Sequence, residues 1–193
     1  MALILASGST IRHQMLTQAG VEHHVVPPGI NESAIKAEAE TPAAIATELA
    51  KEKALAVSRN RPDDWVVGSD SIVSVDGRRF DKPTDRTKAA EHLRYFSGKT
   101  MFLTSAVALA RDGGTEWAVA DEARLKVRPL SEHFIKSYLD SEWPEVGYCV
   151  GVFRMEGRGV NLFETVEGNY FTILGMPLLP LLGALRERGL VTT

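Results

Sequence analysis

Short apolar blocks recur along this chain and alternate with longer amphipathic stretches. The apolar blocks have the length and β-branched content typical of buried strands. A turn dipeptide, Asp76-Gly77, predicts a hairpin after one of them, and Asp112-Gly113-Gly114 joins the two longest. The expected strands cover residues 2–6, 21–26, 65–68, 72–73, 101–110 and 116–127.

The amphipathic stretches predict helices between these strands, because their apolar residues recur three or four positions apart. Thr41-Pro42 is a typical helix start, since proline suits the first helical position. Residues 145–175 are glycine-rich and predict irregular structure or short strands. The expected helices cover residues 11–19, 41–58, 84–96, 131–143 and 177–188. This alternation predicts an α/β fold, with one domain over residues 1–193.

Composition adds limits to this picture. The chain has 193 residues, 44% of them hydrophobic and 24% charged, which is ordinary for a soluble globular protein. Its one cysteine, Cys149, allows neither an intrachain disulfide nor a cysteine-based metal cage. The apolar start at residues 1–6 lacks a basic region, so it is a poor signal peptide, and no run approaches a membrane span of roughly 20 residues. We therefore expect a cytoplasmic protein without a membrane partner.

Charge excludes one class of partner. The 22 basic residues are outnumbered by 25 acidic ones, giving a net charge of -3. A basic field for nucleic acid is therefore not expected. If the protein binds an anion, it must do so through a local cluster of cations.

The first candidate for such a cluster follows the first strand. Ser7-Gly8-Ser9 leads into a predicted helix with Arg12 in its first turn. A helix start offers free N–H groups and a partial positive charge, and glycine lets a ligand approach the backbone. The segment predicts a phosphate site, although an ordinary capped turn has the same pattern.

Three further side chains are candidates for charge chemistry. Lys53 lies at the edge of the apolar stripe of its helix, where it either covers apolar surface or reaches into a cleft. Asp70 follows the apolar run 65–68, so we expect it at the carboxyl end of a strand, as a metal ligand, a general base or a plain turn residue. Glu32, expected in a loop, is a weaker candidate of the same kind.

A second lysine is directed by its neighbour. Pro83 holds the preceding residue extended, which sets the direction of Lys82 and suits a phosphate-binding point charge, or simply a turn. The chain contains no G-x-S-x-G elbow and no zinc-type histidine spacing.

Taken together, these segments resemble the Maf family of nucleoside triphosphate pyrophosphatases over nearly the whole chain. The order and separation of the segments carry the resemblance. They are LASGSTIR (5–12), LAKEKA (49–54), GSDSIV (68–73), KP (82–83), SG (97–98) and GMPL (175–178).

The resemblance implies a fold and a reaction. The fold is an elongated mixed sheet with flanking helices, similar to Maf and inosine triphosphatase proteins, with two lobes around a central cleft. The reaction cleaves a nucleoside triphosphate between its α and β phosphates, with Mg²⁺ or Mn²⁺ as cofactor. Members of the family are commonly homodimers, so the resemblance also implies a homodimer here.

It also implies roles for individual residues. Asp70 would be the catalytic proton acceptor and, with Glu32, a metal ligand. Asn31 stands where many members have a second acid, so the metal site has one carboxylate fewer. The triphosphate would be bound by Ser7, Ser9, Arg12, Lys53 and Lys82.

Three positions bear on the choice of base. Ile11, Ser71 and Glu156 differ from the arginine, threonine and glutamine of the dTTP/UTP branch. The stretch EGRGVNLF (156–163) is similar to the branch that hydrolyses 7-methyl-GTP, whereas Ile11 and Ser71 match neither branch well. A Glu156 carboxylate could accept hydrogen bonds from the N1–H and exocyclic amine of a guanine, and an apolar Ile11 could pack on a base. The alternatives are a dTTP/UTP pyrophosphatase, a phosphatase, and a regulator of septum formation that binds a nucleotide without hydrolysing it.

Overall fold

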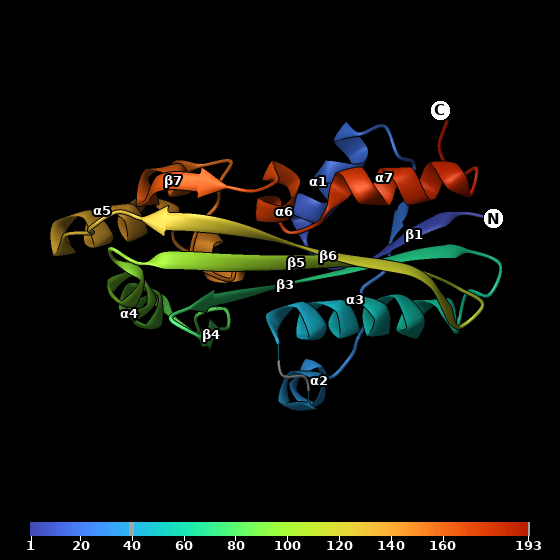
Figure 1. Cartoon of the computed structure of the whole chain (residues 1–193), viewed down its shortest axis with the longest axis horizontal. Helices are drawn as coiled ribbons and strands as arrows, with labels where there is room; N and C mark the ends of the chain where they lie inside the picture. Colours follow the sequence, from blue (N-terminus) through green and yellow to red (C-terminus); the bar gives the residue numbers. More distant parts are fainter. Residues whose placement is uncertain (39–40, 193) are drawn as a thin grey trace. The chain divides into compact units, whose positions relative to one another are not determined.

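The protein, described by a computed structural model over residues 1–38 and 41–192, has an α/β fold, as predicted (Figure 1). Within those residues, one mixed sheet has the strand order β2-β1-β3-β5-β6-β7, with β4 paired to β3. Strand β1 is parallel to β2 and β3, whereas the β3–β4 and β6–β7 pairs are antiparallel. The strands are β1 (Leu3–Ala6), β2 (His24–Val25), β3 (Trp65–Val75), β4 (Arg78–Phe80), β5 (Thr100–Arg111), β6 (Gly114–Val127) and β7 (Phe163–Glu167).

Five helices follow the predicted amphipathic stretches closely, whereas the short helices at residues 32–38 and 170–174 were not predicted. Thr41 begins the longest one by accepting a hydrogen bond from the N–H of Ala44, and Asp85 and Ser131 cap two others in the same way. The helices are α1 (Thr10–Gln18), α2 (Glu32–Glu38), α3 (Pro42–Ser58), α4 (Arg86–Phe96), α5 (Glu132–Glu142), α6 (Tyr170–Leu174) and α7 (Leu178–Glu187), with 3-10 turns at Glu145–Tyr148 and Arg158–Leu162.

The chain forms two compact units. The first holds Met1–Ser71, Thr104–Asp121 and Asn169–Thr193, and the second holds Ile72–Leu103 and Glu122–Gly168. Strands β3, β5 and β6 each run from one unit into the other.

In the first unit, helices cover both faces of the sheet (Figure 1). On one face, Ala54 and Val57 of α3 pack with Ile4 and Val66 of the sheet. On the other, α1 and α7 enclose a larger apolar cluster. Its members include Leu5, Met15, Leu16, Val67, Leu109, Leu181 and Leu185. These two layers fix α1 and α3 on opposite sides of β1 and β3, which positions the side chains described below.

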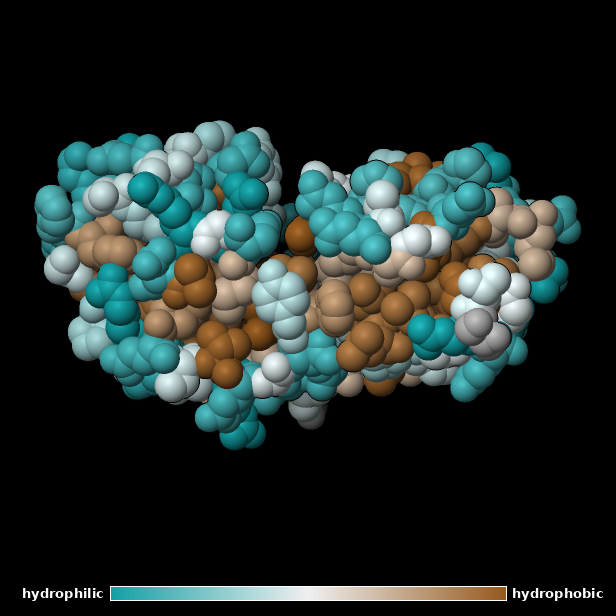
Figure 2. Space-filling view, turned by 90° about the horizontal axis from the view of Figure 1, so that it is seen from above, coloured by the Kyte–Doolittle hydropathy of each residue, from teal (hydrophilic) through white to brown (hydrophobic). Residues whose placement is uncertain are grey.

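Apolar residues also reach the surface of this unit, on the right in Figure 2. Tyr170 is 51% exposed and Leu179 is 54% exposed. The homodimer implied by the family resemblance stays a prediction.

Within the described part of the chain, no helix combines the length and the apolar character that crossing a bilayer requires.

The second unit is built around the predicted hairpin and two helices. Asp76 and Gly77 have φ angles of 51° and 74°, and the turn they form pairs β3 with β4. Phe80 of β4 meets His92 and Phe96 of α4 in edge-to-face contacts. This aromatic cluster gives the second unit its own core.

Three sequence expectations were wrong in detail. Residues 65–68 and 72–73 form one strand, β3, so Asp70 lies inside a strand and not at its carboxyl end. The strand continues because its polar side chains find partners in the interior. The expected strand 21–26 is reduced to His24–Val25. Glu32 opens helix α2 and is not in a loop, and the Asn31 side chain accepts a hydrogen bond from Ser33 at this start.

Candidate functional site

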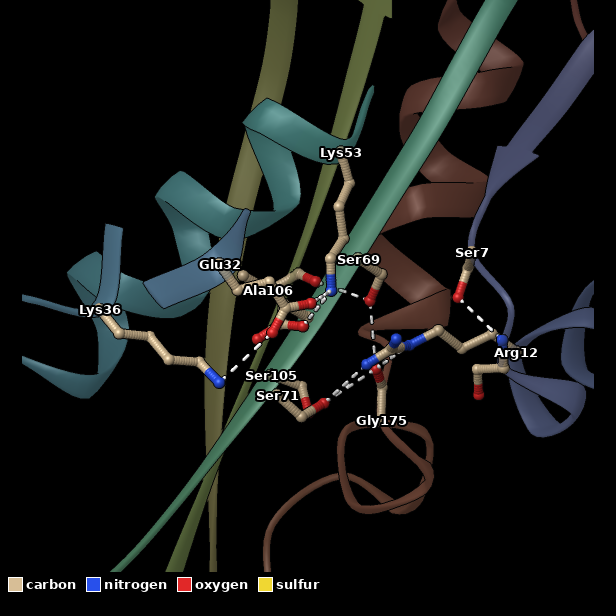
Figure 3. A network of polar contacts seen from close by, with 12 residues as sticks. Ser7, Arg12, Glu32, Lys36, Lys53, Ser69, Ser71, Ser105, Ala106 and Gly175 are labelled. Atoms are coloured by element: carbon tan, nitrogen blue, oxygen red, sulfur yellow. Dashed lines mark hydrogen bonds and ion pairs between the residues drawn. The ribbon is translucent and has the colours of Figure 1, made fainter. Parts of the chain in front are cut away.

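Three charged side chains from three elements of the first unit meet at one point, where Figure 3 shows Lys53 pointing toward Glu32. The Lys53 ammonium on α3 lies 2.5 Å from Asp70 Oδ1 on β3 and 2.7 Å from Glu32 Oε1 on α2. Lys53 and Asp70 are each only 8% exposed. The structure thus brings together three residues that the sequence singled out separately.

Gly68 allows α3 to lie close enough to β3 for Lys53 to reach this point. A Cβ built on Gly68 of β3 would lie 2.1 Å from the carbonyl oxygen of Ala50 and 2.6 Å from the amide nitrogen of Ala54. Only a residue without a side chain lets the helix backbone approach the strand so closely. Since Lys53 lies between these two alanines on α3, the contact places its side chain over the strand next to Asp70.

Opposite charges dominate the surroundings of Glu32. Burial alone would raise the pKa of Glu32, but the hydrogen bond and charge of Lys53 hold the pKa below its usual range. Lys36, 3.3 Å from the other carboxylate oxygen, acts in the same direction. Glu32 is therefore ionised at neutral pH.

Arg12 is anchored from the other side of the strand. Its Nε donates to the carbonyl of Gly175 at 2.9 Å, and its Nη2 donates to the hydroxyl of Ser71 at 3.0 Å. Burial lowers the pKa of the Arg12 guanidinium, while the charges of Asp70 and Glu32 raise it. Arginine keeps its charge under such conditions, so a fixed cation stands near the two carboxylates.

The Gly175 carbonyl collects further donors. The hydroxyl oxygens of Ser69 and Ser71 each lie 3.1 Å from it, and Ser71 lies 2.8 Å from the hydroxyl of Ser105, which is 2.8 Å from the Thr172 carbonyl. Gly175 has a φ of 110°, a conformation that favours glycine. Sequence reasoning missed the roles of Ser69 and Ser105. The available signal was hydroxyl residues in the middle of strands otherwise made of apolar residues.

The loop before α1 presents its backbone to open space. Ser7 Oγ accepts a hydrogen bond from the Ser9 N–H at 3.2 Å, and a Cβ on Gly8 would meet no heavy atom within 4 Å. Ser9 occupies the helix N-cap position without a capping hydrogen bond from its side chain. Ile11, half-buried, packs against the apolar cluster of this unit. The loop thus keeps the free approach that an anion site needs.

The remaining two candidates belong to the second unit. Lys82 is exposed, and Glu156 is exposed with an oxygen 3.3 Å from Arg154 Nε. Burial raises the pKa of Cys149 to about 11; the charge of Glu156 adds to this effect, and Arg154 and Lys82 oppose it. Lys82 and Glu156 therefore share the surroundings of one thiol, within their own unit.

The donor set limits the type of metal. Within residues 1–38 and 41–192, no three histidine, cysteine, aspartate or glutamate side chains converge as a metal cage. Glu32 and Asp70 offer oxygen ligands around a common point. Such a pair fits Mg²⁺ or Mn²⁺, which are held by one or two carboxylates together with water and substrate phosphates.

The chain is similar to several known proteins. The family model described as "Maf-like protein" matches residues 2–188. A nucleoside triphosphate pyrophosphatase of Nitrobacter hamburgensis is 45% identical over 98% of this chain and 95% of the relative. A 7-methyl-GTP pyrophosphatase of Rhizobium etli is also 45% identical, over 98% of this chain and 97% of the relative. A HAM1 protein structure from Coxiella burnetii is more distant, with a TM-score of 0.45 and 12% identity over 65% of this chain and 72% of that one. The chain belongs to the Maf-like protein family.

Proposed function

We propose that the protein is a nucleoside triphosphate pyrophosphatase, a hydrolase of acid anhydrides that converts a nucleoside triphosphate and water to a nucleoside monophosphate and pyrophosphate. The observation that carries the proposal is the meeting of Lys53, Asp70 and Glu32 beside the anchored Arg12. The names of the relatives given above support the same reaction.

Arg12 and Lys53 can neutralise part of the negative charge of the substrate. A nucleoside triphosphate carries roughly four negative charges at neutral pH, and one opposite pair at about 4 Å is worth around 4 kcal/mol at an effective dielectric of about 20, before desolvation. Arg12 is already half-buried and anchored by two hydrogen bonds, so its guanidinium loses little freedom on binding phosphate. Together with Lys53 it can bind a polyphosphate although the protein as a whole has a net charge of -3.

Asp70 is the proposed proton acceptor. Asp70 lies in the middle of β3, and its carboxylate orients and deprotonates a water for in-line attack at the α-phosphorus. Arg12 stabilises the pyrophosphate that leaves. The Ser7–Ser9 loop adds backbone and hydroxyl donors to the phosphates.

A divalent cation is the proposed cofactor. Glu32 and Asp70 would hold it, because their oxygens face a common point. When bound, it would neutralise phosphate charge and raise the acidity of nearby water.

The proposed preference is for a 7-methyl-GTP-like nucleotide. A carboxylate at Glu156 accepts from the two adjacent N–H donors of a guanine edge, a fit that thymine and uracil do not offer. The name of the Rhizobium etli relative, 7-methyl-GTP pyrophosphatase, supports this preference. The triphosphate role of Lys82 rests on the family resemblance and stays a prediction.

A substrate screen tests the proposal. Standard and 7-methylated nucleoside triphosphates are supplied with Mg²⁺ or Mn²⁺, and pyrophosphate and orthophosphate are measured separately. We expect pyrophosphate in equal amount to nucleoside monophosphate, fastest with 7-methyl-GTP. Orthophosphate alone would identify a phosphatase, and binding without turnover would identify a regulator.

A further inference from the structure

Lys53 contacts both carboxylates at the point where a divalent cation would be bound. Its Nζ is within hydrogen-bond distance of Glu32 Oε1 and Asp70 Oδ1, at 2.7 Å and 2.5 Å (Figure 3). Both oxygen atoms therefore lie against the same ammonium. One ammonium therefore serves as the common counter-ion of two acidic groups.

An ammonium and a dication cannot share this point. Both would occupy the position next to Glu32 Oε1 and Asp70 Oδ1, and at such separations two positive charges repel each other strongly in a half-buried setting. The Lys53 side chain is only 10% exposed, so water screens the repulsion poorly. Entry of a cation therefore requires the ammonium to leave both carboxylates.

The neighbouring charges add to this barrier in the protein without nucleotide. Lys36 contacts the second oxygen of Glu32 at 3.3 Å, and Arg12 lies within the electrostatic reach of both carboxylates. The acidic pair is thus already neutralised before any metal arrives. A displaced ammonium needs a new anionic partner, which a polyphosphate provides.

We propose that Lys53 is a displaceable counter-ion, which keeps Glu32 and Asp70 closed to divalent cations until a polyphosphate draws its ammonium away. The inference rests on the proposed function, since the polyphosphate of the substrate is the new partner of Lys53. It has a thermodynamic consequence. Metal and polyphosphate must strengthen each other's binding, while the protein alone binds metal weakly.

The test measures Mn²⁺ binding to the nucleotide-free protein by electron paramagnetic resonance. Lys53→Gln and Lys53→Met remove the charge, and Lys53→Arg retains it. We expect both neutral variants to bind Mn²⁺ about tenfold more tightly than wild type and the arginine variant to stay weak. Adding Glu32→Gln to Lys53→Gln should abolish the gain, because it removes one of the two ligands.

A matched control lies on the same helix. Lys51 is paired with Glu48 at 2.8 Å on the surface of α3, so Lys51→Gln removes an identical charge without touching the acidic pair. It should leave Mn²⁺ affinity unchanged. An equal gain in Lys51→Gln would reduce the effect to a change in net charge and overturn the inference.

Folding and function can be separated from the inference. Glutamine at position 53 can still donate a hydrogen bond to a carboxylate, and Mn²⁺ should raise the melting temperature of this variant more than that of wild type. Unchanged Mn²⁺ affinity in folded Lys53→Gln overturns the counter-ion role even if the wild type releases pyrophosphate. Conversely, tighter Mn²⁺ binding in a protein that cleaves no nucleotide would support the counter-ion role and reject the proposed reaction.

Discussion

The Lys53 ammonium lies 2.5 Å from the Asp70 carboxylate, across 17 residues of sequence, and both side chains are buried. Burying an ion pair costs desolvation energy that the mutual attraction only partly offsets, so such a pair is weak evidence for a stabilising role. Here a third charged group, Glu32, joins the pair, and Arg12 is anchored beside it. So many charged groups in a buried position are better explained by binding or catalysis than by stability.

Asp70→Asn tests the proposed base. Asparagine keeps the size of the side chain but cannot accept a proton, so turnover should fall by about 10²-fold to 10⁴-fold while the fold is kept. Steady-state kinetics and circular dichroism measure the two effects. Asp63→Asn, at an exposed position, is the control and should behave as wild type. Turnover of Asp70→Asn within a few fold of wild type would exclude Asp70 as the proton acceptor.

Gly68→Ala tests the close approach of α3 to β3. The new Cβ would lie 2.1 Å from a helix carbonyl, so the helix must shift, at a cost of about 1–3 kcal/mol in unfolding free energy. The shift also moves Lys53, so KM should rise. Urea titration and kinetics measure both effects.

The same substitution at a roomy glycine is its control. A Cβ on Gly183 in α7 meets no heavy atom within 4 Å, so Gly183→Ala should be neutral or slightly stabilising. If Gly68→Ala and Gly183→Ala have the same stability and KM, the close contact does not position Lys53.

Ser71→Ala tests the anchoring of Arg12. It removes the acceptor of Arg12 Nη2 and a partner of Ser105, so the guanidinium is held by fewer bonds. Loss of about 1 kcal/mol of positioning energy should raise KM about fivefold with little change in kcat. Ser141→Ala is the control, since that hydroxyl donates to carbonyls of its own helix. A drop in kcat at constant KM would instead assign Ser71 to the chemical step.

Glu156→Gln tests the choice of base. Glutamine donates through its amide and no longer offers two acceptor oxygens to a guanine edge, so the preference for 7-methyl-GTP over UTP should fall. The ratio of kcat/KM values for the two substrates measures it. Glu164→Gln on β7 is an exposed control of the same charge. An unchanged ratio would remove Glu156 from substrate selection.

The stability of the second unit should depend on pH through His92. Burial, followed by the charges of Lys88 and Arg78, lowers the pKa of His92 below its ordinary 6.5, while Glu91 and Asp81 oppose them. The unfolded chain therefore takes up the proton first as pH falls. The unfolding free energy is therefore highest above pH 6.5 and falls progressively as the pH drops from 6.5 to the pKa of His92 in the folded protein.

His92→Phe should remove this loss. Among the described residues, the buried His92 Nδ1 has no hydrogen-bond partner, so the substitution breaks no bond of that atom. Urea unfolding at pH 7.5 and pH 5.5 should show a smaller difference in His92→Phe than in wild type. His133→Phe, at an exposed position on α5, is the control. An equal loss in His92→Phe and wild type would show that other groups control the acid response.

Much of the fold was predictable because its signals are local. Thr41-Pro42 marks the start of α3, and Asp76-Gly77 marks the hairpin, since each depends on backbone preferences of a few residues. The continuity of β3 was not predictable in this way. Ser69 and Ser71 find acceptors on residues more than 100 positions away, and local patterns do not record such partners.

The candidate site shows the same division. Asp70 could be singled out because it follows an apolar run, Lys53 because it lies at the edge of an apolar stripe, and Arg12 because it lies in the first turn of a predicted helix. The positions of these side chains could not be predicted. Lys53 is placed by the close approach of α3 to Gly68, and Arg12 is placed by its hydrogen bond to the Gly175 carbonyl, and both contacts form only in the folded chain. The prediction that Glu32 lies in a loop was wrong because α2 has only 7 residues, too few to show a clear apolar period, and Glu32 at its start contacts Lys53 of another helix.

Hydrolysis in ¹⁸O-labelled water tests the central claim most directly. If Arg12 and Lys53 hold the polyphosphate while a water activated at Asp70 attacks the α-phosphorus, one labelled oxygen must appear in the nucleoside monophosphate and none in pyrophosphate. Mass spectrometry of both products distinguishes the outcomes. Label in pyrophosphate or in orthophosphate would place the attack on another phosphorus and contradict the proposed reaction.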